Sequence, residues 1–281
     1  MAINPPSALI SAIELMTQIN KSHVRILDAS WHMPSSERDA KVDYNALHIA
    51  GAGFFDIDGV RDVTSPFPHM LPSAAQFSDA MSALGIANDS LVVVYDTQGL
   101  FSAPRLWWML RVFGHENVRV LDGGLPAWIE VMGVISSEIP MPPATEFTAQ
   151  YVPELVANTS HMLSWSKSGA VQLCDARSPE RFYGREAEPR AGVRSGHIPH
   201  AINIHYRTLL NADGRVKSRS DLATVFKNQS VDVAKPIAAT CGSGMTACII
   251  ALALYELGHT NTPVYDGSWS EWGASSLPIT I

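Results

Sequence analysis

The sequence predicts an α/β fold of two tandem domains, each a mainly parallel sheet flanked by helices. Short apolar runs of strand length alternate with longer helical runs, a pattern typical of parallel sheets. Five short blocks of the first half recur in the second half in the same order, at offsets of 147, 149, 145, 144 and 144 residues. A chain of 281 residues is long enough for two domains of ordinary size. We therefore predict a duplicated domain.

The repeated blocks share their chemical character as well as their order. They comprise an Asp-Ala pair after a strand, a turn that opens with His-Ile, an apolar strand, a Gly-His step, and an Asp-Gly turn followed by Trp. Chance matches would not keep this order over the whole chain. The paired blocks are 27–30 with 174–177, 48–52 with 197–201, 91–96 with 236–241, 113–115 with 257–259, and 121–124 with 265–268.

Strands and helices of the first half are predicted from its apolar runs and its glycines. Gly85 and Gly114 stand just past two helical runs, where a left-handed residue commonly ends a helix. The predicted strands are residues 25–27 and 91–95, and the predicted helices are residues 74–84 and 103–112.

The second half repeats this plan. Residues 171–174 and 237–240 are predicted strands, and residues 247–257 are a predicted helix that Gly258 ends. This helix is apolar on nearly all sides, so we expect it to be buried. Ligands of such folds bind beyond the carboxyl ends of strands, which directs attention to Cys241.

Prolines mark the expected boundary between the domains. Pro140, Pro142, Pro143 and Pro153 favour extended backbone and interrupt helices. We predict a first domain over residues 1–140, a linker over 141–153 and a second domain over 154–281.

A single thiol stands between the strand at 237–240 and the helix at 247–257. The loop reads Cys-Gly-Ser-Gly-Met-Thr over residues 241–246, and its two glycines allow successive N–H groups to point inward. The helix start adds the positive end of its dipole. We therefore expect Cys241 on an exposed loop, stabilised as a nucleophilic thiolate. Asp96 takes its place in the first repeat, so that domain is predicted to be catalytically silent.

Composition excludes several classes of function. The net charge is −7 and the sequence pI is about 5.8, which argues against nucleic-acid binding. The three cysteines form no Cys-x-x-Cys pair, so neither a disulfide framework nor a zinc site is predicted. No apolar run is long enough to span a membrane, and residues 1–10 lack the pattern of a secretory signal. A working thiol suits a reducing compartment, and we predict a cytoplasmic location.

These motifs together resemble the two-domain rhodanese-like sulfurtransferases over nearly the whole chain. The loop at 241–246 is similar to the Cys-Gly-Ser-Gly-Val-Thr loop of the 3-mercaptopyruvate sulfurtransferases. Thiosulfate sulfurtransferases typically carry Arg and Lys where this chain has Gly242 and Ser243. Further support comes from Ser-Pro at 65–66, His-Met-Leu-Pro at 69–72, Ser-Ala-Pro-Arg at 102–105, the tryptophans at 107 and 108, and the stretch 181–197.

The resemblance implies a reaction without metal or organic cofactor. Cys241 would take a sulfur atom from 3-mercaptopyruvate as a persulfide and pass it to a thiol, such as that of thioredoxin, or to cyanide. The loop residues Gly242, Gly244, Met245 and Thr246 would bind the substrate together with Cys241.

The resemblance also implies roles for residues outside the loop. Arg181 and Arg190 would bind the carboxylate and keto oxygen of the donor, which suits the fork geometry of guanidinium groups. From composition alone, the same arginines could instead form local ion pairs with Glu186 and Glu188. Ser243 would act with His69 and Asp58 of the first domain, either polarising the donor carbonyl or relaying a proton.

Three alternatives remain beside this interpretation. A thiosulfate:cyanide sulfurtransferase shares the fold but favours cationic loop residues. A Cys-dependent phosphatase needs the pattern Cys-x5-Arg, and this chain has Ala247 at the position of that Arg. A non-catalytic binding module would commonly lack the cysteine.

The chain departs from the family pattern at two positions: it has Met245 in place of Val, and Phe101 where some relatives carry Tyr.

Overall fold

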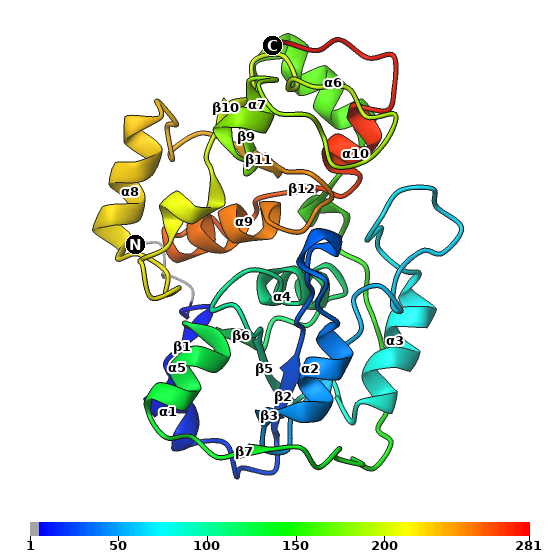
Figure 1. The fold of residues 1–281 in the computed structure, drawn as a ribbon, viewed down its shortest axis with the longest axis vertical. Coiled ribbons are helices and arrows are strands. Elements are labelled where there is room, and N and C mark those ends of the chain that lie inside the picture. Colours follow the sequence, from blue (N-terminus) through cyan, green and yellow to red (C-terminus); the bar gives the residue numbers. More distant parts are fainter. Residues whose placement is uncertain (1–5) are drawn as a thin grey trace.

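Two α/β domains, each with a five-stranded parallel sheet, make up the computed structural model, which describes residues 6–281 (Figure 1). The predicted fold class is confirmed. The expectation that residues 1–10 carry no secretory signal falls in part on residues 1–5, which lie outside the described residues.

The first sheet has the strand order β1-β6-β5-β2-β4, with β5 in the centre. All five residues of β5 are buried and apolar or aromatic, as expected of a strand covered on both faces. The strands are β1 (Leu9–Ile10), β2 (Val24–Asp28), β4 (Gly53–Phe54), β5 (Leu91–Tyr95) and β6 (Val118–Leu121), and a small antiparallel pair joins β3 (His48–Ile49) to β7 (Ile135–Ser136). The helices are α1 (Ala12–Met16), α2 (Ala40–Ala46), α3 (Ala74–Ala83), α4 (Ala103–Val112) and α5 (Gly124–Glu130), with a 3₁₀ turn η1 at Pro34–Ser36.

The second sheet repeats this arrangement in the order β10-β9-β11-β12-β8, with β11 in the centre. Its strands are β8 (Val156–Ala157), β9 (Gln172–Asp175), β10 (Ile202–Asn203), β11 (Ile237–Thr240) and β12 (Val264–Tyr265). The helices are α6 (Thr159–Ser168), α7 (Pro179–Phe182), α8 (Arg219–Asn228), α9 (Ala247–Glu256) and α10 (Ser268–Trp272), with 3₁₀ turns η2 at Pro153–Leu155 and η3 at Tyr206–Leu209. The predicted strands and helices agree with the observed ones within one or two residues at each end.

Helices α4 and α9 meet where the two domains join (Figure 1). Every residue of both helices is buried, as predicted for α9, and both belong to one hydrophobic cluster that runs from domain to domain. The interface is therefore a continuous apolar core. It fixes the loops at the start of α4 and α9 relative to each other.

Two reciprocal hydrogen bonds also join the domains. Asp122 follows β6 and accepts a hydrogen bond from the backbone N–H of Val216, at 2.8 Å. Asp266 follows β12 and accepts one from the backbone N–H of Leu71, also at 2.8 Å. Asp122 and Asp266 are equivalent in the repeat, so each domain supplies the same acceptor to the other.

Residues 137–152 contain neither helix nor strand and include most of the predicted linker. They lie against the first domain: Phe147 is buried in its core, and the N–H of Val152 donates to the carbonyl of Val112 at 2.7 Å. This segment then leads into η2 and the second sheet.

Candidate active site

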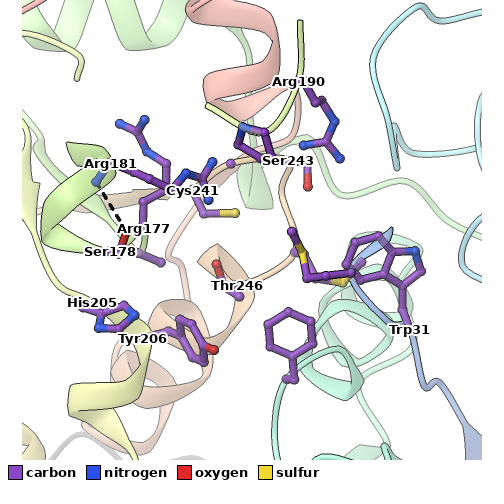
Figure 2. A pocket seen from close by; sticks show the side chains of 16 residues that line it. Trp31, Arg177, Ser178, Arg181, Arg190, His205, Tyr206, Cys241, Ser243 and Thr246 are labelled. Atoms are coloured by element: carbon purple, nitrogen blue, oxygen red, sulfur yellow. Dashed lines mark hydrogen bonds between the residues drawn. The ribbon is translucent and has the colours of Figure 1, made fainter. Parts of the chain in front are cut away.

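Cys241 lies at the carboxyl end of β11 and lines a cavity of about 190 Å³ (Figure 2). Its side chain is only 1% exposed. The expectation of an exposed loop is therefore wrong. The thiol is recessed because α10 covers one side of the loop and His69 and Arg105 of the first domain contact it from the other.

The start of α10 holds two carbonyl groups of the loop. The N–H of Trp269 donates to the carbonyl of Cys241, and the N–H of Ser270 donates to the carbonyl of Gly242, both at 2.9 Å. The hydroxyl of Ser270 also donates to Gly242, at 2.6 Å. Because a trans peptide directs its N–H opposite to its C=O, these bonds turn the following N–H groups away from α10.

Domain 1 holds a third carbonyl of the loop through Arg105, a fully buried residue of α4. Its guanidinium donates to the carbonyl of Gly244 at 3.2 Å and to a carboxylate oxygen of Asp266 at 2.7 Å. Gly244 has a φ of +76°, and a Cβ atom there would stand 2.7 Å from the carbonyl oxygen of Asp266. This close packing explains why the loop requires glycine at this position.

The backbone N–H groups of the loop are left free for a ligand. Within residues 6–281, none of the N–H groups at positions 242–247 donates a hydrogen bond. Helix α9 begins directly after them and adds its positive dipole end. An anion on the Cys241 sulfur would meet these donors, which is the arrangement known from backbone anion sites.

Three arginines line the same cavity: Arg177, Arg181 and Arg190 (Figure 2). Sequence reasoning missed Arg177. It donates to Asp175 through two nitrogens, the shorter bond being 2.7 Å, and its Nη1 donates to Glu188 at 2.8 Å. The repeat could have pointed to it, because block 174–177 ends in Arg where block 27–30 ends in Ser.

Arg181 both lines the cavity and forms a local ion pair. Its Nη2 pairs with Glu188, and its Nε lies 3.3 Å from the same carboxylate. The ion pair with Glu188 that composition predicted is therefore present, while the role of Arg181 toward a donor stays a prediction. A Cβ atom on Gly242 would stand 3.0 Å from Nη2 of Arg181, so the bare glycine leaves the space that this guanidinium fills.

Arg190 differs from the other two because it forms no ion pair with any residue in the range 6–281. Burial, followed by the nearby charge of Arg181, lowers the pKa of Arg190 below its usual value. It remains charged at neutral pH because arginine titrates far above it. The cavity therefore contains one cation without a carboxylate partner.

Asp58, His69 and Ser243 lie in a row across the domain interface. Nδ1 of His69 is 3.1 Å from Oγ of Ser243, and Nε2 is 3.3 Å from Oδ1 of Asp58. The hydrogen bond with His69 lowers the pKa of Asp58, although partial burial opposes this. An ionised carboxylate only accepts, so Nε2 donates to Asp58, while Nδ1 faces both the Ser243 hydroxyl and, at 3.2 Å, the Ser243 carbonyl oxygen.

His69 is buried and takes a left-handed backbone conformation, with φ of +61°. Such a conformation costs energy for a residue with a Cβ atom, and it is commonly found at functional sites. The guanidinium of Arg105 donates to the His69 carbonyl, which holds this turn in place.

Trp31 was not singled out by sequence reasoning. Its indole N–H donates to Oδ2 of Asp58 at 2.7 Å, and its ring meets the His69 ring edge-on at 4.8 Å between centroids. It also lines the cavity, together with His205 and Tyr206 (Figure 2). No pattern around residue 31 distinguished it from a core tryptophan.

The other two cysteines lie in the core, as predicted. Burial raises the pKa of Cys174 to about 12 and also raises that of Cys248. Cys248 donates from its thiol to the carbonyl of Gly244 at 3.2 Å and so supports the loop. Neither is a candidate nucleophile.

Residues 6–281 contain no group of three or more His, Cys, Asp or Glu that could hold a metal ion. No helix in this range is long and apolar enough to cross a membrane.

Known sulfurtransferases are similar to this chain over most of its length. The chain is 44% identical to 3-mercaptopyruvate sulfurtransferase of Rattus norvegicus, over 91% of this chain and 86% of that protein. It is 43% identical to thiosulfate sulfurtransferase of the same organism, over 97% and 94% of the two chains. Thiosulfate/3-mercaptopyruvate sulfurtransferase 1, mitochondrial, of Arabidopsis thaliana is 39% identical, over 99% and 79%.

Structure comparison gives the same answer. The crystal structure of SseA from Escherichia coli, described as a 3-mercaptopyruvate sulfotransferase with the rhodanese fold, superposes with a TM-score of 0.87 at 39% identity, covering 94% of this chain and 99% of that one. The rhodanese-like domain family matches residues 11–131 and 159–275. The chain therefore belongs to the rhodanese family, with one rhodanese-like domain in each half, as the sequence predicted.

Proposed function

We propose that this sulfurtransferase takes sulfur from 3-mercaptopyruvate through a persulfide on Cys241 and transfers it to a thiol or to cyanide. The observation that carries the proposal is the position of Cys241 at the cavity wall, among free N–H groups of its loop and beside three arginines. The relatives at 44% identity support both the reaction class and the donor.

In the first half-reaction, the Cys241 thiolate attacks the sulfur atom of the donor. A sulfur–sulfur bond forms and the carbon–sulfur bond of mercaptopyruvate breaks. Its electron pair goes to the leaving carbon as the enolate of pyruvate, which then takes up a proton and departs. The loop N–H groups stabilise the negative charge on sulfur in the way an oxyanion hole does.

Arg190 and Arg181 orient the donor in this scheme. A planar guanidinium binds a carboxylate through two parallel hydrogen bonds. Arg190 is free to do so, while Arg181 remains anchored to Glu188 and presents its outer edge to the cavity. Binding at both groups places the donor sulfur near Cys241, which lowers the entropic barrier of the attack.

The row of Asp58, His69 and Ser243 serves the leaving enolate. Asp58 orients the His69 ring by accepting from Nε2, which places Nδ1 beside the hydroxyl and the carbonyl oxygen of Ser243. Ser243 lines the cavity, and its hydroxyl stabilises the enolate either by polarising the carbonyl oxygen or by relaying a proton.

In the second half-reaction, the acceptor attacks the outer sulfur of the persulfide. A thiolate acceptor becomes a persulfide and cyanide becomes thiocyanate, and in both cases the Cys241 thiolate leaves with its electron pair. Two separate half-reactions give ping-pong kinetics. The thiol acceptors, thioredoxin among them, remain predictions.

Thiosulfate:cyanide sulfurtransfer is the alternative activity, because thiosulfate sulfurtransferase is 43% identical to this chain. Overall identity thus does not separate the two donors, and the loop provides the distinction. Gly242 and Ser243 add no positive charge for a thiosulfate dianion. We expect kcat/KM to be higher for mercaptopyruvate.

The test is mass spectrometry of the protein after incubation with mercaptopyruvate without an acceptor. We expect the peptide containing Cys241 to gain the mass of one sulfur atom and to lose it when cyanide is added. A persulfide on Cys174 or Cys248 instead would contradict the proposed nucleophile. Steady-state rates with each donor then decide the preference, and equal or faster turnover of thiosulfate would refute it.

The cellular setting remains a prediction. We expect a cytoplasmic protein, whereas one relative is named as mitochondrial. Fractionation of cells that express the full chain would decide between the two compartments.

A further inference from the structure

The charges around the cavity do not cancel. Three guanidinium groups lie at its wall, and only two carboxylates pair with them: Asp175 with Arg177, and Glu188 with both Arg177 and Arg181. Arg190 is the cation left without a partner. The cavity therefore presents one uncompensated positive charge to a donor, apart from the Cys241 thiolate and the loop N–H groups that face it.

Glu188 is the carboxylate next to the cavity that determines this charge balance, because it pairs with two of the arginines that line the wall. Its side chain is only 4% exposed and it is shared by two arginines, at 2.8 Å from Nη1 of Arg177 and in direct contact with Nη2 of Arg181. Asp175 lies deeper, fully buried at the end of β9 beneath Arg177. The charge of Glu188 thus acts directly on the guanidinium groups that a donor meets.

We infer that Glu188 makes the cavity selective for sulfur donors with a single negative charge over donors with two. The inference rests on the proposed function and goes beyond it, because it assigns part of the donor preference to a residue outside the cysteine loop. Mercaptopyruvate carries one carboxylate and an ordinary neutral thiol at pH 7, whereas thiosulfate is a dianion.

Coulomb attraction explains the direction of the selectivity. A carboxylate directly behind the arginines of the cavity wall repels a dianion twice as strongly as a monoanion at the same distance, and the recessed site reduces screening by solvent. Neutralising Glu188 should therefore remove more repulsion from thiosulfate than from mercaptopyruvate. Glu188 also holds Arg181 in place, so its loss also disturbs the binding of a carboxylate.

The experiment compares Glu188→Gln with wild type and with Glu186→Gln. Gln keeps the size of the side chain, and Glu186 is an exposed carboxylate two residues away that forms no ion pair in the described chain. We expect the ratio of kcat/KM for thiosulfate to that for mercaptopyruvate to rise roughly tenfold in Glu188→Gln, mainly through a lower KM for thiosulfate. The ratio should stay within about twofold of wild type in Glu186→Gln, since an exposed charge is screened.

Inhibition by inert anions gives a readout that does not depend on sulfur transfer from thiosulfate. Sulfate is a dianion and pyruvate a monoanion, and neither donates sulfur to a thiol. Against mercaptopyruvate, the inhibition constant of sulfate should fall in Glu188→Gln by a larger factor than that of pyruvate. An unchanged donor ratio together with unchanged sulfate inhibition in a folded variant would overturn the inference.

A second variant covers the case in which Glu188→Gln does not fold. Glu188→Asp keeps the negative charge beside Arg177 and Arg181 and shortens the side chain by only one methylene group, so it should fold. Its donor ratio should stay within about twofold of wild type, and a roughly tenfold rise would overturn the inference, because the preference would then depend on the geometry of the ion pairs and not on the charge. Wild type that forms no persulfide with either donor would instead refute the proposed function, so the two failures are distinguishable.

Discussion

The loops that follow the central strands of the two sheets have a similar backbone arrangement but begin with different side chains. After β5 the loop begins with Asp96, and after β11 it begins with Cys241. Each leads into a buried helix at the domain interface, α4 or α9. In each, the carbonyl of the first residue accepts a backbone hydrogen bond at 2.9 Å, from Leu125 in one case and Trp269 in the other.

In the first loop, the carboxylate of Asp96 occupies the anion site formed by the backbone N–H groups. Oδ2 of Asp96 accepts from the N–H groups of Phe101, Ser102 and Ala103 at 2.7, 2.9 and 2.9 Å, and Oδ1 accepts from Gln98 at 2.9 Å. In the second loop, the corresponding N–H groups have no partner within the described chain.

The difference shows which part of the site is made by the fold and which by the side chain. Backbone and helix dipole provide an anion cradle in both repeats. A short carboxylate closes the cradle permanently, whereas a thiol leaves it open for a charge that forms during the reaction. Substitutions of Asp96, of Cys241 and of residues near Cys241 test this comparison of the two loops.

The largest effect is expected from Cys241→Ser. A hydroxyl does not form a persulfide, so we predict a loss of sulfur transfer of about a thousandfold or more, while the fold is retained. Steady-state assays with mercaptopyruvate measure it. Cys174→Ala is the matched control, because Cys174 is buried away from the cavity, and it should keep most of the activity. Substantial activity in Cys241→Ser would show that the open cradle does not need its thiol.

The next effect concerns stability, in Asp96→Ala. This change leaves buried N–H groups of the first loop without their acceptor, and we predict a loss of about 3 kcal/mol in the free energy of unfolding. Urea unfolding measures it. Asp96→Asn retains one acceptor oxygen and should lose less. A stable Asp96→Ala variant would mean that the carboxylate does not hold the first loop together.

The double variant Gly242→Arg, Ser243→Lys should shift the donor preference toward thiosulfate by roughly tenfold in the ratio of kcat/KM values, because it adds two positive charges to the loop. A side chain at residue 242 also displaces Arg181, whose Nη2 occupies that space. Gly242→Ala tests the displacement alone and should weaken mercaptopyruvate without favouring thiosulfate. An unchanged ratio in the double variant would remove the loop from donor selection.

The smallest effect is expected from Asp58→Asn, as a pH-dependent change in stability. The hydrogen bond with His69 lowers the pKa of Asp58 below its ordinary 3.8, so the carboxylate stabilises the folded state above about that pH. This contribution is lost as the pH falls through the lowered pKa. Because the side chain is 56% exposed, we predict a destabilisation of at most about 1 kcal/mol at pH 7. Thermal unfolding should show the difference between variant and wild type at pH 7 and its decline as the pH falls below about 3.8.

The sequence predicted the regions whose structure depends on nearby residues. Strand β5 and helix α4 have the predicted bounds because apolar runs and glycine stops act locally. The duplicated blocks revealed the second sheet and showed that Asp96 and Cys241 are equivalent.

Contacts between distant segments were not readable from the sequence. The recessed position of Cys241 depends on the packing of His69 and Arg105 from the other domain. The pairing of Arg177 with Glu188 depends on the fold of a loop that contains no regular structure beyond α7. Neither follows from propensity or periodicity, because loop closure brings these groups together only in the folded chain.

The reciprocal hydrogen bonds of Asp122 with Val216 and of Asp266 with Leu71 give the contact between the two repeats an approximate two-fold symmetry. A contact in which each unit offers the same acceptor to the other is how identical subunits meet across a two-fold axis. A one-domain ancestor with this aspartate and its partner loop could pair with its own copy in the same way. In the fused chain only one repeat needs a thiol, because the repeat with Asp96 still contributes its aspartate to the contact.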